Sequence, residues 1–267
     1  MLFAATTVNY LDRQVLSLTW KDFIAPEFHW TNNDYGTIAA LFSILYAMGM
    51  LFAGRIVDWL DTKKGYLVSI GIWSAGAMIH AFCGIGTSGI TTGKWLVGFA
   101  GAKEAIAMVS NTSLIASVSV TLFIVARFVL ALGEAGNFPA AIKATAEYFP
   151  KKDRAFSTSI FNAGATVGAL ASPVTIPFIA KAWGWEAAFL IIGGLGFIWM
   201  GFWVFIYKKP EAHPRVNAAE LEYIHQDNDL IGNGNTSGNN KTSFMACFKY
   251  RQTWAFAIGK FMTDPWW

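Results

Sequence analysis

Six runs of about 20 predominantly apolar residues constrain the fold of this chain more than any other feature of its sequence. A hydrocarbon layer about 30 Å thick is crossed by about 20 helical residues that rise 1.5 Å each. Each run therefore predicts a membrane-spanning helix. The runs cover residues 2–23, 35–57, 65–86, 118–142, 156–182 and 185–207, and a seventh begins near residue 254.

The composition supports a membrane protein. Hydrophobic residues make up 54% of the 267 positions and charged residues only 14%, against about 45–50% and about 25% in soluble domains. This excludes an ordinary soluble enzyme. The net charge of the chain is only +3, and its basic residues lie in clusters between the apolar runs. We therefore expect no nucleic-acid partner. We expect an all-α integral membrane protein in which the two cysteines, Cys83 and Cys247, lie on opposite sides of the bilayer and do not pair.

The basic clusters also predict the orientation, because Lys and Arg concentrate in cytoplasmic loops. They place the N-terminus and the central loop in the cytoplasm, with the chain in the cytoplasmic (inner) membrane. The stretch 95–109 carries Lys103 and Glu104 in its middle, and we interpret it as an extracytoplasmic insert. The clusters are Arg55, Lys63 and Lys64; Lys151, Lys152 and Arg154; and the basic residues of 208–251.

Three segments are expected along the chain: a six-helix bundle (1–207), a cytoplasmic central loop (208–252) and the start of a second bundle (253–267). Within the central loop, Asn217 followed by Glu220 predicts a capped short helix, and residues 232–241 have the composition of a flexible linker. Charged Asp12 argues against a signal peptide. Both ends of the sequence suggest part of a longer protein.

Four charged residues interrupt the first and fourth runs: Asp12, Arg13, Arg127 and Glu134. Each costs about 2.5–3.5 kcal/mol at the centre of a spanning helix, so such charges are normally paired or face a cavity. Arg127 and Glu134 are seven residues apart and share a helix face, which Asn137 continues. In the first run Asn9 and Arg13 share a face, while Asp12 points about 100° away.

The residue types indicate the chemistry. A guanidinium grips a carboxylate with two parallel hydrogen bonds, so Arg13 and Arg127 indicate an organic anion as ligand. Glu134 can take up and release a proton beside them. The alternative is that the four charges only hold the bundle together. For Asn162 and Thr166, one turn apart in the fifth run, helix packing and substrate contact are both open. Pro139, with Gly133 and Gly136, predicts a bend in the fourth run and allows close packing.

The sequence gives no reason to expect a cofactor or a metal. The four histidines are scattered, and the GxGxxG pattern of Gly84, Gly86 and Gly89 follows a membrane run instead of a strand.

The loop from Gly54 to Gly65 (GRIVDWLDTKKG) resembles the GxxxD loop with paired basic residues of the major facilitator superfamily. With NYLDR in the first run and RFVLALGEAGNFPAAI from Arg127, the chain is similar to the anion:cation symporter branch, and most of all to bacterial hexuronate transporters. That family has twelve spans. The resemblance therefore implies the N-terminal half, built as two inverted three-helix repeats, plus the start of helix seven.

The resemblance also implies a role for each site residue. Arg13 and Arg127 would bind the substrate carboxylate, and Glu134, with Asp12, would carry the coupling proton. Other residues would make secondary contacts with the substrate in the cavity, and the cytoplasmic loop would form part of a gate. The secondary contacts would be Tyr10, Asn137 and Asn162, and the gating residues Gly54, Asp58, Lys63 and Lys64. Asp61 departs from the family, which usually has Gly there.

The function expected from this resemblance is proton-coupled symport of a sugar acid, such as galacturonate or glucuronate, by alternating access. In the empty state, Glu134 is expected to compete for Arg127. The alternatives are another organic anion (aldonate, aldarate or aromatic carboxylate), sodium instead of protons, or a non-transporting receptor or structural subunit. An enzyme is not expected, and the sequence leaves the oligomeric state open.

Overall fold

The computed structural model describes residues 1–226 and 249–263, and the described residues form helices, turns and loops. The chain divides into two units, Met1–Gln226 and Asp227–Trp267. All the candidate site residues lie in the first unit. The predicted linker at 232–241 and Cys247 lie outside the described residues, whereas Cys83 is buried with a free thiol.

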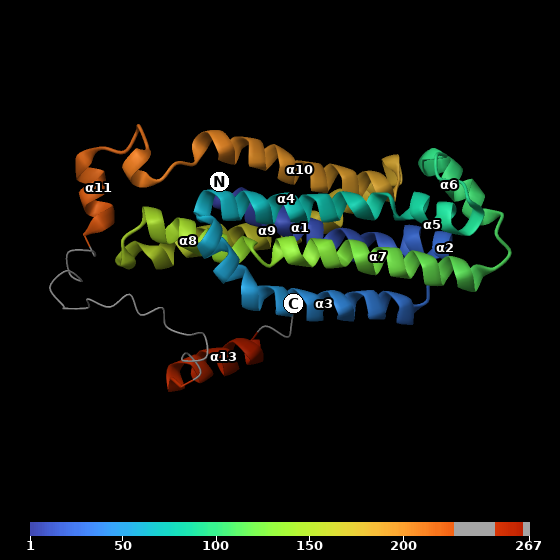
Figure 1. The fold of residues 1–267 in the computed structure, drawn as a ribbon, viewed down its shortest axis with the longest axis horizontal. Coiled ribbons are helices and arrows are strands. Elements are labelled where there is room, and N and C mark those ends of the chain that lie inside the picture. The colour runs from blue at the N-terminus through green and yellow to red at the C-terminus, as the bar shows by residue number, and fades with distance from the viewer. Residues whose placement is uncertain (227–248, 264–267) are drawn as a thin grey trace. The chain divides into compact units, whose positions relative to one another are not determined.

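The first unit is a bundle of helices (Figure 1). At one end lie α2 and the α5–α6 region, and at the other end lie α8 and α11 (Figure 1). The second unit contains α13 (Arg251–Thr263), which begins about three residues before the predicted seventh run and overlaps it. The elements of the first unit are α1 (Leu2–Thr19), the π-helical turn η1 (Trp20–Ile24), α2 (Ala25–Phe28), α3 (Asn32–Leu60), α4 (Thr62–Ala81), α5 (Cys83–Thr92), α6 (Gly98–Ala107), α7 (Thr112–Glu134), α8 (Asn137–Tyr148), α9 (Lys151–Trp183), α10 (Trp185–Ile206), η2 (Pro210–Ala212) and α11 (Ala218–His225).

Several of these helices are long and apolar enough to cross a membrane. Among the described residues, four candidates meet that test: α3, the α7–α8 stretch Thr112–Tyr148, α9 and α10. The pair α4 and α5, bent by 49°, makes a fifth. The helix α1 is not among them, because polar residues such as Asn9, Asp12 and Arg13 lower its hydropathy. The all-helical membrane fold is thus confirmed, while six spans and inverted repeats remain predictions.

Capping interactions and breaks explain where key helices begin. Thr31 and Asp34 form a reciprocal capping box at the start of α3. Asn217 accepts the Glu220 N–H at 2.7 Å and starts α11 as predicted. The fourth run breaks between α7 and α8 at residues 135–136, in the stretch where Gly133, Gly136 and Pro139 predict a bend. Pro139 lies in the first turn of α8, where a backbone N–H has no partner within the helix, so the N–H that proline lacks costs no hydrogen bond.

Two apolar clusters hold the bundle together. One is centred on aromatic side chains near α2 and the start of α10, and the other on aromatic side chains of α4 and the end of α10. On α7, the first cluster includes Ala126 and the second includes Leu130, so Arg127 lies between them in the sequence. On α7, Arg127 is therefore placed where one apolar cluster ends and the other begins.

Candidate functional site

An ion pair between α1 and α7 forms the centre of the candidate site. The Arg13 Nη2 and Nε atoms donate to Glu134 Oε2 at 2.9 and 3.1 Å. The Glu134 side chain is fully buried, and that of Arg13 is 26% exposed. We expected Glu134 to compete for Arg127, and this pairing is different. Arg127 is two turns from Glu134 on one helix, about 10 Å along the axis, whereas Arg13 approaches from a neighbouring helix.

Asp12 and Arg127 complete a group of four charges that we call the charge quartet: Asp12, Arg13, Arg127 and Glu134. Asp12 interacts electrostatically with the other three members, although its offset of about 100° on α1 had left this open. Its two carboxylate oxygens are buried without a hydrogen bond in the described part of the chain. Arg127 is 5% exposed, and its guanidinium lies over the Phe42 ring at 5.1 Å. No hydrogen bond or ion pair holds that guanidinium within the described residues.

Further polar atoms beside the quartet are buried without partners. Glu134 Oε1, both polar side-chain atoms of Asn9 and the Asn137 Nδ2 atom lack hydrogen bonds among the described residues. Asn137 Oδ1 accepts a hydrogen bond from the Tyr66 hydroxyl at 3.0 Å. Buried polar groups in proteins are nearly always bonded, and exceptions point to a ligand, ion or water. The site therefore offers donors and acceptors that a polar ligand can satisfy.

Aromatic rings surround the arginines. Arg13 lies over the rings of Tyr46 at 4.5 Å and Tyr10 at 5.4 Å. Tyr10 was predicted as a contact, while Tyr46 and Phe42 were missed. They are four residues apart on α3 and stack at 6.0 Å, and that spacing in an apolar run is indistinguishable from ordinary packing. The predicted contact Asn162 is exposed on α9, and no hydrogen bond or ion pair within the described chain joins it to the quartet.

The predicted gating loop is held by ion pairs and by hydrogen bonds to backbone carbonyls. Asp58 Oδ1 pairs with Lys143 Nζ of α8 at 3.1 Å, and Lys143 also donates to the Val57 carbonyl at 3.2 Å. Lys63 Nζ donates to the Val204 carbonyl of α10 at 2.8 Å. Lys64 is exposed, and a Cβ added to Gly54 on α3 would meet no neighbouring atom within 4 Å. The loop is thus tied to α8 and to the end of α10.

Asp61, the departure from the family pattern, has φ 69° and ψ 155°. Its Oδ1 accepts the Thr62 N–H at 2.9 Å, and its Oδ2 pairs with Lys209 at 3.1 Å. Partial burial acts to raise the pKa of the Asp61 carboxyl, but these two contacts hold it below its ordinary value. The family's Gly is explained by this backbone conformation, which few other residues adopt.

A carboxylate that we did not predict, Glu147 of α8, joins the same end of the bundle. It accepts short hydrogen bonds from the Thr62 hydroxyl and the Tyr207 hydroxyl. Tyr148 donates to the Lys208 carbonyl. Glu147 begins the sequence EYFP, which follows the motif that starts at Arg127, so the sequence did offer it as a candidate. Nothing in the sequence indicated its hydrogen-bond partners.

The opposite end of the bundle is held by a second polar cluster. Lys103 of α6 pairs with Glu27 of α2 at 3.1 Å and with Glu186 of α10 at 3.8 Å. The Trp185 indole also donates to Glu27 at 2.9 Å. Burial raises the pKa of the Glu27 carboxyl, and the contacts with Trp185 and Lys103 offset this only in part. The insert predicted at 95–109 therefore includes a helix that is fastened to the bundle.

Comparison with known proteins agrees with the geometry. The Major Facilitator Superfamily matches residues 2–266. The chain is 27% identical to a galacturonate transporter of Dickeya chrysanthemi over 98% of its own length, and 27% identical to a hexuronate transporter of Escherichia coli (strain K12) over 98%. It is 28% identical to a probable galactarate/D-glucarate transporter of the same strain over 86%. It spans 65% of the first of these relatives, 52% of the second and 46% of the third.

Proposed function

This chain belongs to the major facilitator superfamily, and we propose that it forms part of a proton-coupled symporter that imports a sugar acid across the cytoplasmic membrane by alternating access. The observation that carries the proposal is the buried charge quartet. Two guanidinium groups, two carboxylates and several unpaired polar atoms meet between α1 and α7. Structural ion pairing alone would leave no reason for so many unsatisfied atoms.

The two arginines have different tasks. Glu134 already occupies Arg13, while Arg127 faces the Phe42 ring and forms no ion pair among the described residues. Arg127 is therefore the first group that an incoming carboxylate meets. Arg13 becomes available only when its ion pair with Glu134 breaks, and both guanidinium groups can then bind the substrate.

Charge balance supports a proton as the coupling ion. With all four groups ionised the quartet is neutral. One bound carboxylate adds one negative charge, and a net charge in a buried site costs several kcal/mol. A proton on Glu134 cancels that charge and weakens the bond to Arg13 in the same step. Asp12, in electrostatic contact with Glu134, offers a second proton site for a substrate with two carboxylates.

Release follows the same steps in reverse. When the site opens to the cytoplasm, Glu134 loses its proton and recovers Arg13, and the substrate loses one of its two anchors. One proton per monovalent anion moves no net charge, so uptake draws on the pH gradient alone. A second proton would add about 2.3 kcal/mol per 100 mV of membrane potential. Sodium in place of the proton is the alternative.

A sugar acid is the substrate class that the site chemistry and the relatives favour together. The arginines recognise the carboxylate, and Tyr10, Asn9 and Asn137 provide polar atoms for hydroxyl groups. The relatives named above are transporters of galacturonate, hexuronate and galactarate/D-glucarate. We infer a hexuronate such as galacturonate or glucuronate. The main alternative is another organic anion, either an aldonate, an aldarate or an aromatic carboxylate.

The gate belongs to the same proposal. Asp58 and Lys143 link α3 to α8 by one exposed ion pair, and Lys63 links α4 to the end of α10. Exposed pairs of this kind are worth about 0–1 kcal/mol. Such weak contacts suit a gate that must open in every transport cycle, with Gly54 and Lys64 on the same loop.

Substitution of the arginines tests the binding role. We expect Arg13→Lys and Arg127→Lys to lower uptake of labelled galacturonate at least a hundredfold in proteoliposomes, because Lys cannot form two parallel bonds with a carboxylate. The matched control is Arg154→Lys, since the Arg154 guanidinium donates to the Ala146 and Phe149 carbonyls at the end of α8.

Full uptake by both quartet variants would support a receptor or structural subunit with merely paired charges. Competition by a panel of unlabelled carboxylates in the same assay identifies the substrate. Stronger inhibition by an aldarate or aromatic acid than by hexuronates would replace our assignment of the substrate class.

A further inference from the structure

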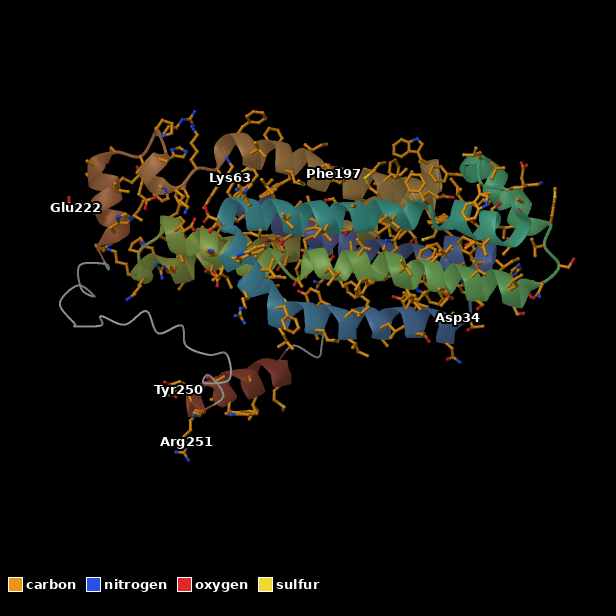
Figure 2. All side chains as sticks on the ribbon, in the orientation of Figure 1. Asp34, Lys63, Phe197, Glu222, Tyr250 and Arg251 are labelled. Atoms are coloured by element: carbon orange, nitrogen blue, oxygen red, sulfur yellow. The ribbon has the colours of Figure 1, made fainter. Side chains whose placement is uncertain are left out.

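A cavity separate from the charge quartet lies between the start of α3 and the first turns of α7, with a volume of about 510 Å³. Pockets for small molecules occupy about 300–1,000 Å³. Its walls are formed by His29 and Thr31 before α3, by Asp34 within α3, and by Ser113, Ser117 and Thr121 among the residues of α7. Asp34 and Lys63 lie at opposite ends of the bundle (Figure 2), so this cavity is remote from the gating loop.

The lining on the α7 side includes a set of hydroxyl groups. Ser113, Ser117 and Thr121 follow at intervals of four residues and lie along one side of α7, where all three are exposed. Thr121 donates to the Ser117 carbonyl at 2.8 Å, and the Ser117 hydroxyl forms no hydrogen bond within the described residues. The side of α7 that lines this cavity is therefore polar.

The opposite wall is a fixed acceptor. Asp34 Oδ2 accepts the N–H and the hydroxyl of Thr31 at 2.8 and 2.7 Å, so the capping box holds the carboxylate in place. The negative charge of Asp34 disfavours a ligand carboxylate at this position and favours ligand hydroxyl groups that can donate to it. The serine and threonine hydroxyls across the cavity both donate and accept. Together they complement a ligand that carries many hydroxyl groups.

The cavity is also placed on the two helices that lead to the arginines. From Thr121 to Arg127 is six residues, about 9 Å along α7, and α3 carries Phe42 and Tyr46, which cover the guanidinium groups. Resting on the function proposed above, we propose that this cavity is an outer subsite that binds the hydroxyl groups of the sugar acid before its carboxylate reaches Arg127. The predicted orientation puts the subsite on the extracytoplasmic side.

The direct test is the double substitution Ser117→Ala with Thr121→Val in the full-length protein. We expect KM for uptake into right-side-out vesicles to rise about tenfold with kcat unchanged, the effect of losing two ordinary hydrogen bonds from a binding step. In inside-out vesicles, where substrate enters from the gate side, KM should stay as in the parent. Thr175→Val is the control, since Thr175 is likewise exposed and donates to the Ala171 carbonyl on α9 at 2.9 Å.

An unchanged KM for uptake, or an equal rise in both vesicle orientations, overturns the subsite. Saturation-transfer NMR with galactose, a neutral sugar, tests it without any transport. Loss of the galactose signal in the double variant, with the signal kept in Thr175→Val, supports the subsite, and an equal signal in both overturns it. Galactose binding here in a protein that moves no sugar acid would refute the proposed function and leave the subsite standing.

Discussion

At the level of single residues, the backbone of Asp61 departs from what an aspartate prefers. Its positive φ with an extended ψ is nearly restricted to Gly and costs other residues about 1–3 kcal/mol. The bond to the Thr62 N–H and the exposed ion pair with Lys209 offset part of that cost. The same loop carries Lys63 and Lys64, so its geometry matters for the proposed gate.

We expect Asp61→Gly to raise the free energy of unfolding by about 1 kcal/mol. The variant loses the Asp61 cap, which Gly replaces at a cost of a few tenths of a kcal/mol. It also loses an exposed ion pair worth about 0–1 kcal/mol. The backbone strain that Gly relieves exceeds these two losses together. Asp61→Ala keeps the strain and loses the cap, so it should lower stability by about 1 kcal/mol. Thermal unfolding in detergent compares the two variants. A lower Tm for the Gly variant than for the Ala variant would contradict this reading.

The sequence was sufficient to find the charged residues of the site but not their pairing. Intramembrane charges stand out by cost alone, so Arg13, Arg127, Asp12 and Glu134 were all identified. Which arginine meets Glu134 depends on how α1 crosses α7, and no local pattern encodes that crossing. Glu147 was missed for the same reason, because both its partners come from other helices.

Among the helices, α1 and α9 approach closely along a seam of glycines. A Cβ on Gly168 would lie 2.5 Å from the Thr7 carbonyl and 2.9 Å from the Tyr10 Cβ, and Gly164 faces the Phe3 carbonyl as tightly. Small residues let helix backbones approach in this way inside membranes. The seam fixes α1, and with it Arg13, against the bundle.

We expect Gly168→Ala to lower stability by about 1–3 kcal/mol, the usual cost of forcing atoms into a packed interface. It should also reduce transport, because α1 carries half of the quartet. Gly201→Ala on α10 is the matched control: no atom lies within 4 Å of its added Cβ, and it should leave stability equal or up to about 1 kcal/mol higher. Detergent Tm values measure both. Equal Tm changes in the two variants would show that the close approach of α1 and α9 at Gly168 does not govern the effect.

The polar cluster of Glu27, Lys103 and Glu186, which we call the clamp of α2, α6 and α10, makes the stability of that end of the bundle depend on pH. Since burial raises the pKa of Glu27 above its ordinary value, the folded state binds that proton more tightly than the unfolded state. The stability contributed by Glu27 is therefore present below the ordinary carboxyl pKa and is lost as pH rises through the raised one.

We expect Glu27→Gln, which keeps an acceptor for the Trp185 indole, to remove this contribution. The stability advantage of the variant over the parent should shrink as the pH falls from 8 toward 4. Detergent Tm values across that range measure the difference, with Glu104→Gln on the same helix α6 as Lys103 as the control. An advantage that grows toward acid pH would reverse the sign of our argument.

Helix positions were predictable from hydropathy, whereas the bend in the third run was not. The long runs became α3, α9 and α10 with ends shifted by a few residues. The third run was expected to be one helix, but it bends by 49° after Ala81. The fourth breaks at residues 135–136, where Gly133, Gly136 and Pro139 predicted a bend, and both glycines pack tightly against α4. Such breaks depend on tertiary neighbours, which a hydropathy window does not include.

Over the whole molecule, one bundle carries the buried charge quartet, the proposed gate and the hydroxyl-lined cavity. The family is shown by the match over residues 2–266. The sequence alone predicted that family and the quartet, while the cavity and the clamp of α6 appeared only in three dimensions. In both, residues that are far apart in sequence meet side by side, and neither has a periodic signal.

The central claim is that the proton on Glu134 couples uptake to the pH gradient by releasing Arg13. Glu134→Gln fixes the protonated form, so it should abolish pH-driven uptake of the sugar acid in proteoliposomes while keeping counterflow, the exchange of labelled for unlabelled substrate that needs no net proton movement. Measuring the two activities side by side is decisive. Retained exchange with lost accumulation is the result we predict, and exchange lost as thoroughly as accumulation would contradict the role of Glu134.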